Sequence, residues 1–480
     1  MKRNRKVKIL ATLGPVSSEE EIIEKLFIAG TDVFRINMSH TNHDRMRILV
    51  KRIRNVEKKI GRPIGILIDL QGPKLRVGTF VNGEEKLVVG QIFTLDNKNI
   101  PGNSTRVYLP HPEILKAVKP CERLLIDDGR LELISEKCNN HSIECRVISG
   151  TFISDRKGVS LPDTMLAVGA LTEKDNEDLI AVLQEEIDWI ALSFIQRPQD
   201  IEAVRKITKG CVSLLSKIEK PQAVERLQEI IALSDALMVA RGDLGVEMPL
   251  ESVPGIQIEI INACRIAGKP VVVATQMLES MIHAPVPTRA EVSDIATAVL
   301  EGADAIMLSA ESASGQYPIE AVQTMDRIAQ TIERDANYAQ RMNAKNSKPE
   351  PTGADAISLA ARQIAETLDL SAIVAYTGTG ATGIRASRER PSTPIIALSP
   401  IIQTARRLAL VWGLHSVVTC DAHSLDDMVE RACAIAYAEG FSVLEDRIII
   451  TAGVPFGQPG GTNMLKIASI RKENQKRAIF

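Results

Sequence analysis

The chain has 480 residues, enough for about three domains, and its 45% hydrophobic and 25% charged residues are typical of a globular protein. A formal net charge of −2 and 3% aromatic residues exclude a general affinity for nucleic acid or anionic lipid, and no apolar stretch approaches the ~20 residues that span a bilayer. The seven cysteines are scattered without a C-x-x-C pair, which argues against disulfides and structural zinc and predicts a reducing, cytoplasmic location.

Short apolar segments rich in β-branched residues recur along the chain, separated mostly by segments with helical periodicity. Eight such βα repeats with nearly continuous apolar strands favour a closed parallel (β/α)8 TIM barrel, an α/β fold, while an open doubly wound sheet remains the alternative. The eight predicted strands are residues 7–13, 32–37, 64–70, 188–194, 212–218, 235–240, 270–275 and 304–310.

A long segment between the third and fourth predicted strands has a residue pattern that differs from that of the barrel. Its apolar and polar residues alternate, and the pair Asp128-Gly129 is typical of a hairpin turn, so we predict an inserted all-β lid domain. Residues 341–353 are polar, contain two prolines and predict a linker. Beyond it, four apolar runs (371–378, 393–399, 416–420 and 446–453) alternate with helical segments and predict a C-terminal α/β domain. The predicted domains are 1–72 with 163–342 (barrel), 73–162 (lid) and 343–480 (C-terminal).

A (β/α)8 barrel carries its active site at the C-terminal ends of its strands. A single polar residue at a strand end is most simply explained as a solvated terminus or a helix cap. Here every predicted strand ends in a group that can bind an anion or a metal ion, so we interpret the set as one polar site. In chain order these groups are Thr12, Arg35, Asn37, Ser39, His40, Asp69, Ser193, Lys217, Glu219, Arg241, Gly242, Asp243, Thr275, Ser309 and Glu311.

The charges of this set indicate a class of chemistry. Glu219 and Asp243 end neighbouring strands, and two converging carboxylates favour a hard divalent cation such as Mg²⁺. Arg35 and Lys217 at the same end of the barrel indicate a phosphorylated substrate. Together they predict phosphoryl transfer, which depends largely on positioning and on neutralising charge. Gly242 has no Cβ and would let backbone N–H groups approach a ligand carboxylate or phosphate.

Ten motifs occur in order along the chain: ATLGPVS, FRINMSH, IDLQGPKLRVG, KGVSLPD, LTEKD, SKIEKPQAV, MVARGDLGVEMP, ATQMLESM, PTRAEVSDIA and MLSAESASGQYP. In this order they resemble the pyruvate kinase family, bacterial type, over essentially the whole chain and most strongly in the barrel. The resemblance implies the glycolytic transfer of a phosphoryl group from phosphoenolpyruvate to ADP, giving pyruvate and ATP. It also implies dependence on Mg²⁺ or Mn²⁺ and assembly into a homotetramer.

The resemblance assigns roles to matching positions of this chain. Lys217 would stabilise the phosphoryl group in flight, with Arg35 helping to hold it, and Glu219 and Asp243 would bind the divalent ion. The backbone of Gly242 and Asp243 would hold the substrate carboxylate, supported by Arg241. Thr275 would contact the substrate near the face where enolpyruvate gains its proton, with Ser309 and Glu311 in a proton relay. The nucleotide site would contain Arg76, Lys157, Asn37 and His40, under a lid that excludes water.

The family's monovalent-cation site matches Asn37, Ser39, Asp69 and the carbonyl of Leu70. Members that require K⁺ typically carry Glu where this chain has Lys74, and Lys at that position accompanies K⁺ independence. An ammonium group can supply the positive charge that the ion otherwise supplies. We therefore predict that K⁺ can bind but is not required; the alternative is a surface lysine at a lid hinge.

The C-terminal domain contains a second candidate anion site. A predicted strand leads through Thr377, Thr379, Gly380, Ala381 and Thr382 into a helix, and free N–H groups at a helix N-terminus suit a phosphate. A purely structural turn is equally compatible with the residues, but the family's effector loop falls here. The segment GVPFGQPGGTNMLKI resembles the family's C-terminal loop. We predict a phosphorylated allosteric effector.

Two other functions stay open at the level of sequence. A metal-dependent lyase or aldolase acting on pyruvate or phosphoenolpyruvate would use the same barrel, but it would not need Lys217, the pair Arg76 and Lys157, or a lid. A non-catalytic descendant that senses metabolites would not need to keep Lys217, Glu219, Asp243 and Thr275 intact.

Overall fold

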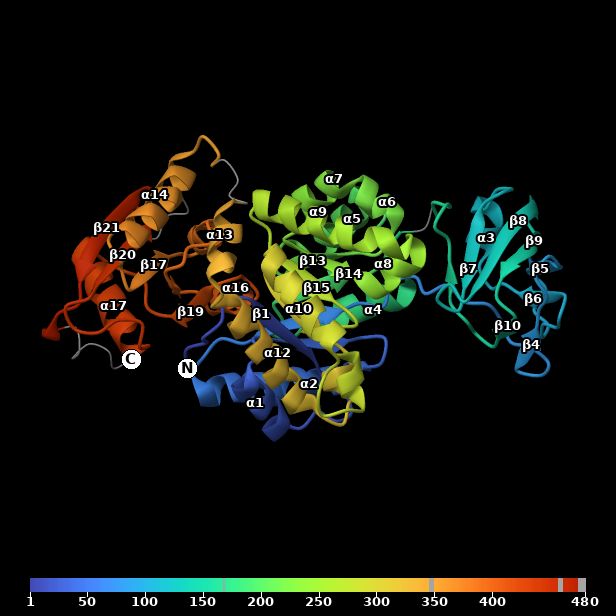
Figure 1. Ribbon diagram of the computed structural model, residues 1–480, viewed down its shortest axis with the longest axis horizontal. Helices are drawn as coiled ribbons and strands as arrows, with labels where there is room; N and C mark the ends of the chain where they lie inside the picture. Colours follow the sequence, from blue (N-terminus) through green and yellow to red (C-terminus); the bar gives the residue numbers. More distant parts are fainter. Residues whose placement is uncertain (167–168, 345–348, 456–460, 474–480) are drawn as a thin grey trace.

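The structure is a computed structural model that describes residues 1–166, 169–344, 349–455 and 461–473. Three bodies lie in a row, with the barrel in the centre, the lid domain at one end and the C-terminal domain at the other (Figure 1). No helix within these ranges is both long enough and apolar enough to cross a membrane. The row places the lid and the C-terminal domain at opposite ends of the barrel.

Eight parallel strands close into a barrel in the order β1-β16-β15-β14-β13-β12-β3-β2. This confirms the TIM barrel and rejects the open sheet. Each strand lies within one of the eight predicted segments, and nearly every strand residue is buried, as expected for strands covered on both faces. The strands are β1 (Lys8–Thr12), β2 (Val33–Asn37), β3 (Gly65–Asp69), β12 (Trp189–Leu192), β13 (Ser213–Ile218), β14 (Ala236–Ala240), β15 (Val271–Ala274) and β16 (Ala305–Leu308).

Helices surround the barrel and bury their apolar faces against the strands in one large core. The helices are α1 (Glu20–Ala29), α2 (His43–Ile60), α4 (Glu173–Val182), α5 (Pro198–Thr208), α6 (Pro221–Glu225), α7 (Leu227–Leu233), α8 (Arg241–Glu247), α9 (Val253–Ile266), α10 (Arg289–Glu301), α11 (Ala310–Ala313), α12 (Pro318–Glu333) and α13 (Ala336–Ala344), with 3₁₀ turns η1 (Leu250–Ser252) and η2 (Glu279–Ile282). Helix α13 occupies the first part of the predicted linker, because Tyr338 and Met342 pack into the barrel core.

The inserted segment forms its own β-rich domain with a separate core. A six-stranded sheet has the order β11-β7-β8-β9-β5-β6, and β10 pairs with β4. Asp127, Asp128 and Gly129 have positive φ angles between antiparallel β7 and β8, which confirms the predicted hairpin. The domain also contains a short helix, α3 (Pro112–Ala117), so the expectation of an all-β lid was wrong in this detail. Its strands are β4 (Glu84–Lys86), β5 (Ile92–Asp96), β6 (Arg106–Tyr108), β7 (Arg123–Ile126), β8 (Leu131–Asn139), β9 (Ser142–Ser149), β10 (Phe152–Ser154) and β11 (Val159–Ser160).

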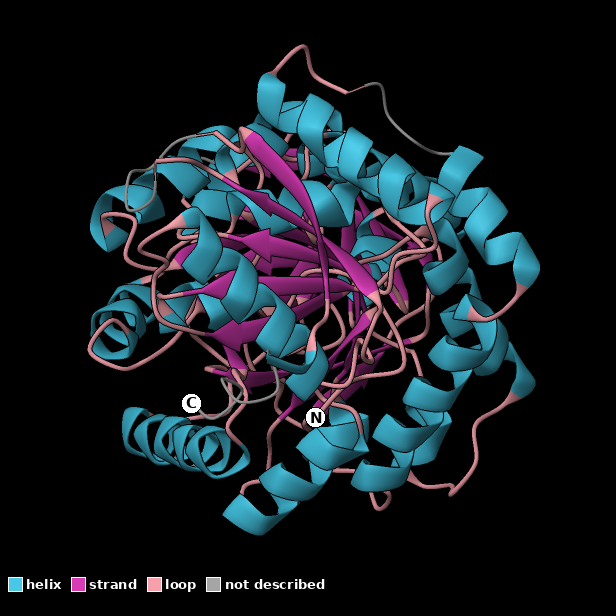
Figure 2. Ribbon diagram, turned by 90° about the vertical axis from the view of Figure 1, so that its left-hand side faces the viewer, coloured by secondary structure: helices cyan, strands magenta, loops and turns pink. Residues whose placement is uncertain are grey.

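The C-terminal domain is a five-stranded sheet in the order β19-β18-β17-β20-β21, with helices packed against it (Figure 2). The predicted strand at 416–420 is displaced to β19 (Leu414–Val418). Strand β21 (Met464–Ser469) was not predicted, because it is an antiparallel edge strand whose partly exposed residues lack a continuous apolar run. The other elements are α14 (Gly353–Thr367), β17 (Ala372–Tyr376), α15 (Ala381–Arg388), β18 (Ile395–Ser399), α16 (Ile402–Leu408), α17 (Leu425–Ala438) and β20 (Arg447–Ala452).

The C-terminal domain closes the end of the barrel that lies opposite the lid. Ala409 and Leu410, which follow α16, belong to the apolar cluster that fills the barrel interior. Arg406 on α16 forms a buried ion pair with Glu57 on α2, with 2.5 Å between Arg406 Nη2 and Glu57 Oε2. These contacts fix the two bodies to each other through both apolar burial and a paired charge.

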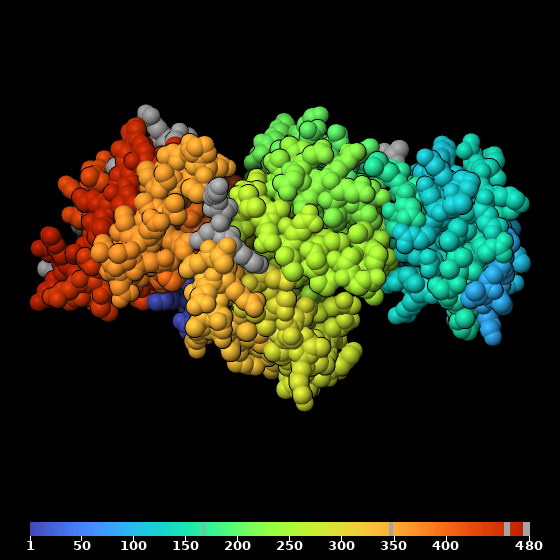
Figure 3. All heavy atoms as spheres, turned by 45° about the horizontal axis from the view of Figure 1, so that its top comes forward, coloured from blue at the N-terminus to red at the C-terminus, as the bar shows by residue number. Residues whose placement is uncertain are grey.

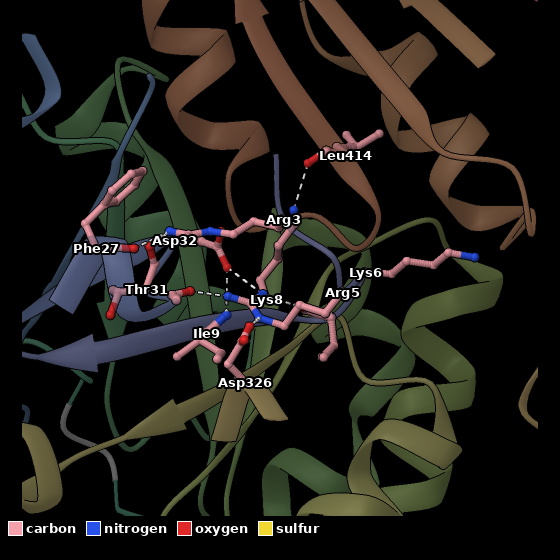
Figure 4. A network of polar contacts seen from close by, with 12 residues as sticks. Arg3, Arg5, Lys6, Lys8, Ile9, Phe27, Thr31, Asp32, Asp326 and Leu414 are labelled. Atoms are coloured by element: carbon pink, nitrogen blue, oxygen red, sulfur yellow. Dashed lines mark hydrogen bonds and ion pairs between the residues drawn. The ribbon is translucent and has the colours of Figure 1, made fainter. Parts of the chain in front are cut away.

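A network of polar contacts ties the N-terminal segment to the same end of the barrel (Figure 4). Arg5 Nη1 lies 2.8 Å from Asp32 Oδ2 and Arg5 Nε lies 2.7 Å from Asp326 Oδ1. Lys8 Nζ donates to the carbonyl of Leu414 at 2.7 Å and so links the barrel to the C-terminal domain. Burial alone would raise the pKa of Asp32, but the neighbouring cations Arg5, Lys8 and Arg3 hold this pKa well below its usual range.

We expect Asp32→Asn to destabilise the folded protein strongly at neutral pH. The substitution removes the Asp32 carboxylate as an ion-pair partner of the buried Arg5. Breaking a buried ion pair lowers the free energy of unfolding by about 3–5 kcal/mol. Because the folded pKa of Asp32 is depressed, its stabilisation is complete above its ordinary pKa of 3.8 and is lost as the pH falls below it. Denaturant unfolding at pH 7 and at successively lower pH measures this difference.

The matched control is Asp44→Asn, because the Asp44 side chain is 91% exposed and, among the residues that the structure describes, pairs only with Arg47. It should change the free energy of unfolding by less than about 0.5 kcal/mol. Equal effects of the two substitutions at pH 7 would contradict the assignment of Asp32 as the centre of the network.

Candidate active site

A cleft lies between the barrel and the lid, and Asp243, one of the predicted strand-end groups, lines it. The cleft is open to solvent, and its lining residues also include Lys74, Asp128 and Phe194. In the space-filling view an indentation separates the lid from the barrel (Figure 3). The predicted site therefore lies where two bodies meet, which is a common place for a ligand to bind.

Lys217 is the centre of a buried charged cluster at the end of β13. Its Nζ atom lies 2.8 Å from Glu219 Oε1, 3.6 Å from Asp69 Oδ1 and 2.9 Å from the hydroxyl of Ser193. Burial alone would lower its pKa, but the carboxylates of Asp69, Glu219 and Asp243 outweigh that effect and raise the pKa of Lys217. Lys217 therefore stays positively charged throughout the neutral pH range.

Arg35 and Asp69 form a second part of the same cluster. Arg35 donates from Nε to Asp69 Oδ2 at 2.8 Å and from Nη1 to the Thr12 hydroxyl at 3.0 Å. Burial alone would raise the pKa of Asp69, but Lys217 and Arg35 lower it below its usual value. The two cations thus share one ionised carboxylate, which holds both side chains at the centre of the strand ends.

Glu219 is buried and incompletely satisfied. Its Oε2 accepts the backbone N–H of Phe194 at 2.7 Å, whereas Oε1 accepts no hydrogen bond from the described residues, although Lys217 Nζ is its ion-pair partner. Burial raises the pKa of Glu219 to about 7, with Lys217 opposing this shift and Asp243 adding to it. A further cation near Oε1 would satisfy this oxygen and favour the ionised carboxylate.

The residues after β14 form the short helix α8, which Arg241 holds in place. Arg241 donates to Asp294 at 2.6 Å and to the carbonyl of Thr275 at 2.6 Å. The N–H of Gly242 donates to the Thr275 hydroxyl at 2.8 Å, so within the protein alone this donor already has a partner. Asp243 is exposed to the cleft. Thr275 itself has a φ of 72°, a strained value for a β-branched residue at a functional position.

Ser309 and Glu311 lie next to each other at the end of β16. Glu311 is buried, and its carboxylate accepts the backbone N–H groups of Ser309 at 2.7 Å and Leu278 at 3.2 Å. Burial raises the pKa of Glu311. These bonds connect the loops after β15 and β16, so this carboxylate has a structural role whatever its part in proton transfer.

The predicted nucleotide residues lie on both sides of the cleft. Arg76 and Lys157 are on neighbouring antiparallel segments where the lid joins the barrel, as the bridge between Arg76 and Gly158 indicates. Lys157 pairs with Asp127 at 2.8 Å, and Arg76 donates to the carbonyl of Arg156. His40, in the loop after β2, is exposed.

Of the four residues predicted to bind a monovalent cation, Asn37, Asp69 and Leu70 have oxygens that already accept hydrogen bonds within the protein. Asn37 Oδ1 accepts the N–H of Ser39 at 3.0 Å, Asp69 accepts from Arg35, and the carbonyl of Leu70 accepts from Ser193 at 2.9 Å. Lys74 is exposed and lines the cleft with Asp243, and no ion pair joins it to any residue in the described ranges.

The predicted effector turn connects β17 to α15. Thr377 accepts the N–H of Gly380 at 2.8 Å, and the hydroxyls of Thr382 and Thr462 lie 2.9 Å apart. Ala381 begins α15, and Thr379 is exposed. Part of the C-terminal loop that resembles the family, residues 456–460, lies outside the described residues.

A family model described as the pyruvate kinase barrel domain matches residues 4–322, and one described as the pyruvate kinase alpha/beta domain matches residues 355–468. The chain belongs to the pyruvate kinase family. A pyruvate kinase of Methylorubrum extorquens is 57% identical over 100% of both chains, and one of Agrobacterium vitis is 45% identical over 97% of this chain and 99% of its own. A crystal structure of a pyruvate kinase from Cryptosporidium parvum superposes with a TM-score of 0.92 at 33% identity and covers 97% of this chain and 96% of its own.

These matches confirm the predicted function, that of a pyruvate kinase, and favour neither the lyase nor the metabolite sensor. Membership in the family implies phosphoenolpyruvate and ADP as substrates and includes Mg²⁺ and K⁺ among the ions that the family uses. The residues present fit a divalent ion, because the buried Oε1 of Glu219 accepts no hydrogen bond from the described residues and Asp243 is exposed to the cleft. No group of three or more His, Cys, Asp or Glu side chains in the described part of the chain could hold a metal by itself. Glu219 and Asp243 would contribute two oxygens, and a hard cation takes its other ligands from substrate and water.

Three residues to which the sequence analysis gave no role contact those to which it did. Ser193 links Lys217 to the carbonyl of Leu70, Phe194 donates its N–H to Glu219 from a backbone with a φ of 55°, and Asp294 pairs with Arg241. The sequence analysis included Ser193 in the polar set because it ends a predicted strand, but gave it no individual role. The sequence contained no signal for Phe194 or Asp294. Phe194 contacts Glu219 through its backbone N–H, and Asp294 lies on a helix 53 residues from its partner Arg241 in sequence.

We expect Ser193→Ala to lower kcat about tenfold, because a hydrogen bond to a charged group contributes about 1.5–3 kcal/mol and part of this holds Lys217 in place. Steady-state kinetics of pyruvate formation measure the effect. Ser216→Ala is the control, since Ser216 lies beside Lys217 on β13 but bonds to Ser234 on the other side of the strand. A kcat equal to that of the unaltered enzyme in Ser193→Ala would refute this role.

Proposed function

We propose that this pyruvate kinase transfers the phosphoryl group of phosphoenolpyruvate to ADP at the cluster around Lys217. The observation that carries this proposal is the buried, charged ammonium of Lys217 between Asp69 and Glu219, at the end of the barrel that faces the lid. Phosphoryl transfer needs positive charge held rigidly where the oxygens of the transferred group pass. A pre-ionised lysine fixed by carboxylates meets this need with little reorganisation.

In this mechanism the side chains act by position and charge. Lys217 and Arg35 hold the phosphoryl group from one side, and Asp69 keeps both cations oriented. A divalent ion bound by Glu219 and Asp243 would neutralise charge on the phosphoryl and carboxylate oxygens of the substrate. The substrate carboxylate would lie against the backbone of Gly242 and Asp243, which Arg241 supports, and would compete with Thr275 for the Gly242 N–H.

After transfer, the enolate of pyruvate must gain a proton on carbon. Thr275 is the group that we place at that face, because its hydroxyl accepts the N–H of Gly242, which follows β14 beside the proposed metal ligand Asp243. Ser309 and Glu311 would complete a relay to solvent. ADP would bind across the cleft with its phosphates between Arg76 and Lys157 and with Asn37 and His40 nearby, and closure of the lid would exclude water.

We also propose the domain limits as predicted, with residues 1–72 and 163–342 as the barrel, 73–162 as the lid and 343–480 as the C-terminal domain. A phosphorylated effector would bind at the turn formed by Thr377, Thr379, Gly380, Ala381 and Thr382.

The enzyme would work in the cytoplasm as a homotetramer. Sedimentation analysis tests the tetramer, and titration with sugar phosphates and nucleoside monophosphates tests the effector, with Thr382→Ala expected to reduce any response.

Lys217→Met should lower kcat by at least about 10²–10³-fold, the effect of removing one charge-stabilising donor from a preorganised site. Its KM for phosphoenolpyruvate should change far less, because Arg35 and the divalent ion remain. Steady-state kinetics give both constants. Retention of nearly full turnover in a folded Lys217→Met enzyme would overturn the proposed chemistry.

The enzyme should turn over without K⁺. Lys74 and Asp243 line the same cleft, and oxygens of Asn37, Asp69 and Leu70 already accept hydrogen bonds from protein groups. Rates with K⁺ and with tetramethylammonium should therefore be similar, whereas Lys74→Glu should be strongly activated by K⁺. Lys98→Glu, a change of the same charge on the lid, should leave the K⁺ response unaltered. An unaltered enzyme that is inactive without K⁺ would remove Lys74 from this role.

A further inference from the structure

A second buried ion pair lies beside the metal-binding carboxylates, and the mechanism above does not use it. Lys220 Nζ lies 2.5 Å from Glu247 Oε1, and the two side chains are only 10% and 4% exposed. Both residues line the cleft together with Asp243. Neither is among the groups that hold the phosphoryl group, the nucleotide or the divalent ion.

Lys220 and Glu247 are each close in sequence to one of the two proposed metal ligands. Lys220 directly follows Glu219, at the point where β13 ends and α6 begins. Glu247 is the last residue of α8 and follows Asp243 by four residues, so the two carboxylates lie on the same side of this helix. The ion pair therefore joins the segment that carries one metal-binding carboxylate to the segment that carries the other.

Helix α8 is short and depends on contacts at its two ends. At its start, Arg241 bonds to Asp294 and to the carbonyl of Thr275, and the Thr275 hydroxyl accepts the N–H of Gly242. At its end, Glu247 is held by Lys220. Asp243 lies between these two anchors. The first anchor ties α8 to the loop after β15, and the second ties it to β13, which carries Glu219.

The net stability of the fold does not explain why this pair is charged. Burying two charges costs more free energy than well-packed apolar residues of the same volume would, and Glu247 Oε2 accepts no hydrogen bond within the described ranges. What an ion pair supplies, and an apolar contact does not, is a defined direction and distance between two segments.

We propose that Lys220 and Glu247 are positioning residues that set the spacing between Glu219 and Asp243 and thereby the affinity for the divalent ion. They act through these carboxylates and do not touch the ion. The inference rests on the proposed function, since it takes Glu219 and Asp243 as the metal ligands.

The test is direct binding of Mn²⁺ to the full-length enzyme without substrates, followed by the electron paramagnetic resonance signal of the free ion. Lys220→Met and Glu247→Gln should each raise the dissociation constant for Mn²⁺ about 10-fold or more, as loss of an outer partner of a metal ligand typically does. Turnover should recover as Mn²⁺ is raised to saturation, because the residues that act on the phosphoryl group are unchanged. Lys220→Arg, which keeps the charge, should restore most of the affinity.

Two further variants keep the test decisive. If either single variant fails to fold, Lys220→Met combined with Glu247→Leu replaces the pair by apolar groups and should fold yet bind Mn²⁺ weakly. Arg406→Met, which breaks the buried pair with Glu57 at the opposite end of the barrel, should lower the melting temperature without changing Mn²⁺ affinity.

The outcomes separate this inference from the proposed function. If Glu219→Gln and Asp243→Asn weaken Mn²⁺ binding while the Lys220 and Glu247 variants bind it as the unaltered enzyme does, the positioning role is overturned and the proposed function stands. If Glu219→Gln and Asp243→Asn bind Mn²⁺ normally, the assignment of the metal ligands fails, and this inference fails with it.

Discussion

The active site depends on one electrostatic constraint: an ammonium group buried among carboxylates at the end of a barrel strand. Lys217 can remain charged in that position only because Asp69 and Glu219 lie within ion-pair distance. Those carboxylates in turn need cations, and Asp69 obtains a second one in Arg35. Charge and geometry are therefore coupled, since a shift of any of these side chains leaves another buried charge without its partner.

The barrel supplies the rigidity that this constraint requires. The strands are buried on both faces, and residues of the C-terminal domain, Ala409 and Leu410, complete the apolar core inside them. Charged networks lie at both ends of the barrel. The network around Asp32 and Arg5 anchors the N-terminal segment at one end, and the cluster around Lys217 faces the lid at the other. The first ties the N-terminal segment to the barrel, whereas the second is buried at the strand ends near Asp243, which lines the cleft.

The lid is a body with its own core, separate from that of the barrel. It meets the barrel near Arg76 and Lys157, which pair with lid residues and backbone. A domain of this kind can change its angle to the barrel without disturbing either core. The buried charged cluster thus belongs to the barrel, whereas Arg76 and Lys157 lie where the lid joins it.

The sequence alone predicted the eight barrel strands. A strand that is buried on both faces consists of a short run of apolar residues, and such a run can be recognised without knowing which segments pack against it. The sequence also predicted that the polar groups at the strand ends form one site, since parallel strands in a closed barrel bring their carboxyl ends together. Edge strand β21 and helix α3 were missed, because partly exposed elements have weaker patterns.

Only the tertiary structure decided which charges pair and which backbone groups are already occupied. Asp69 pairs with both Arg35 and Lys217, the Gly242 N–H donates to Thr275, and Lys220 at the start of α6 pairs with Glu247 at the end of α8. Such pairings depend on distances of a few ångströms between segments far apart in the chain. The order of residues determines which segments become neighbours through the fold, but the packing of side chains determines which atoms finally meet.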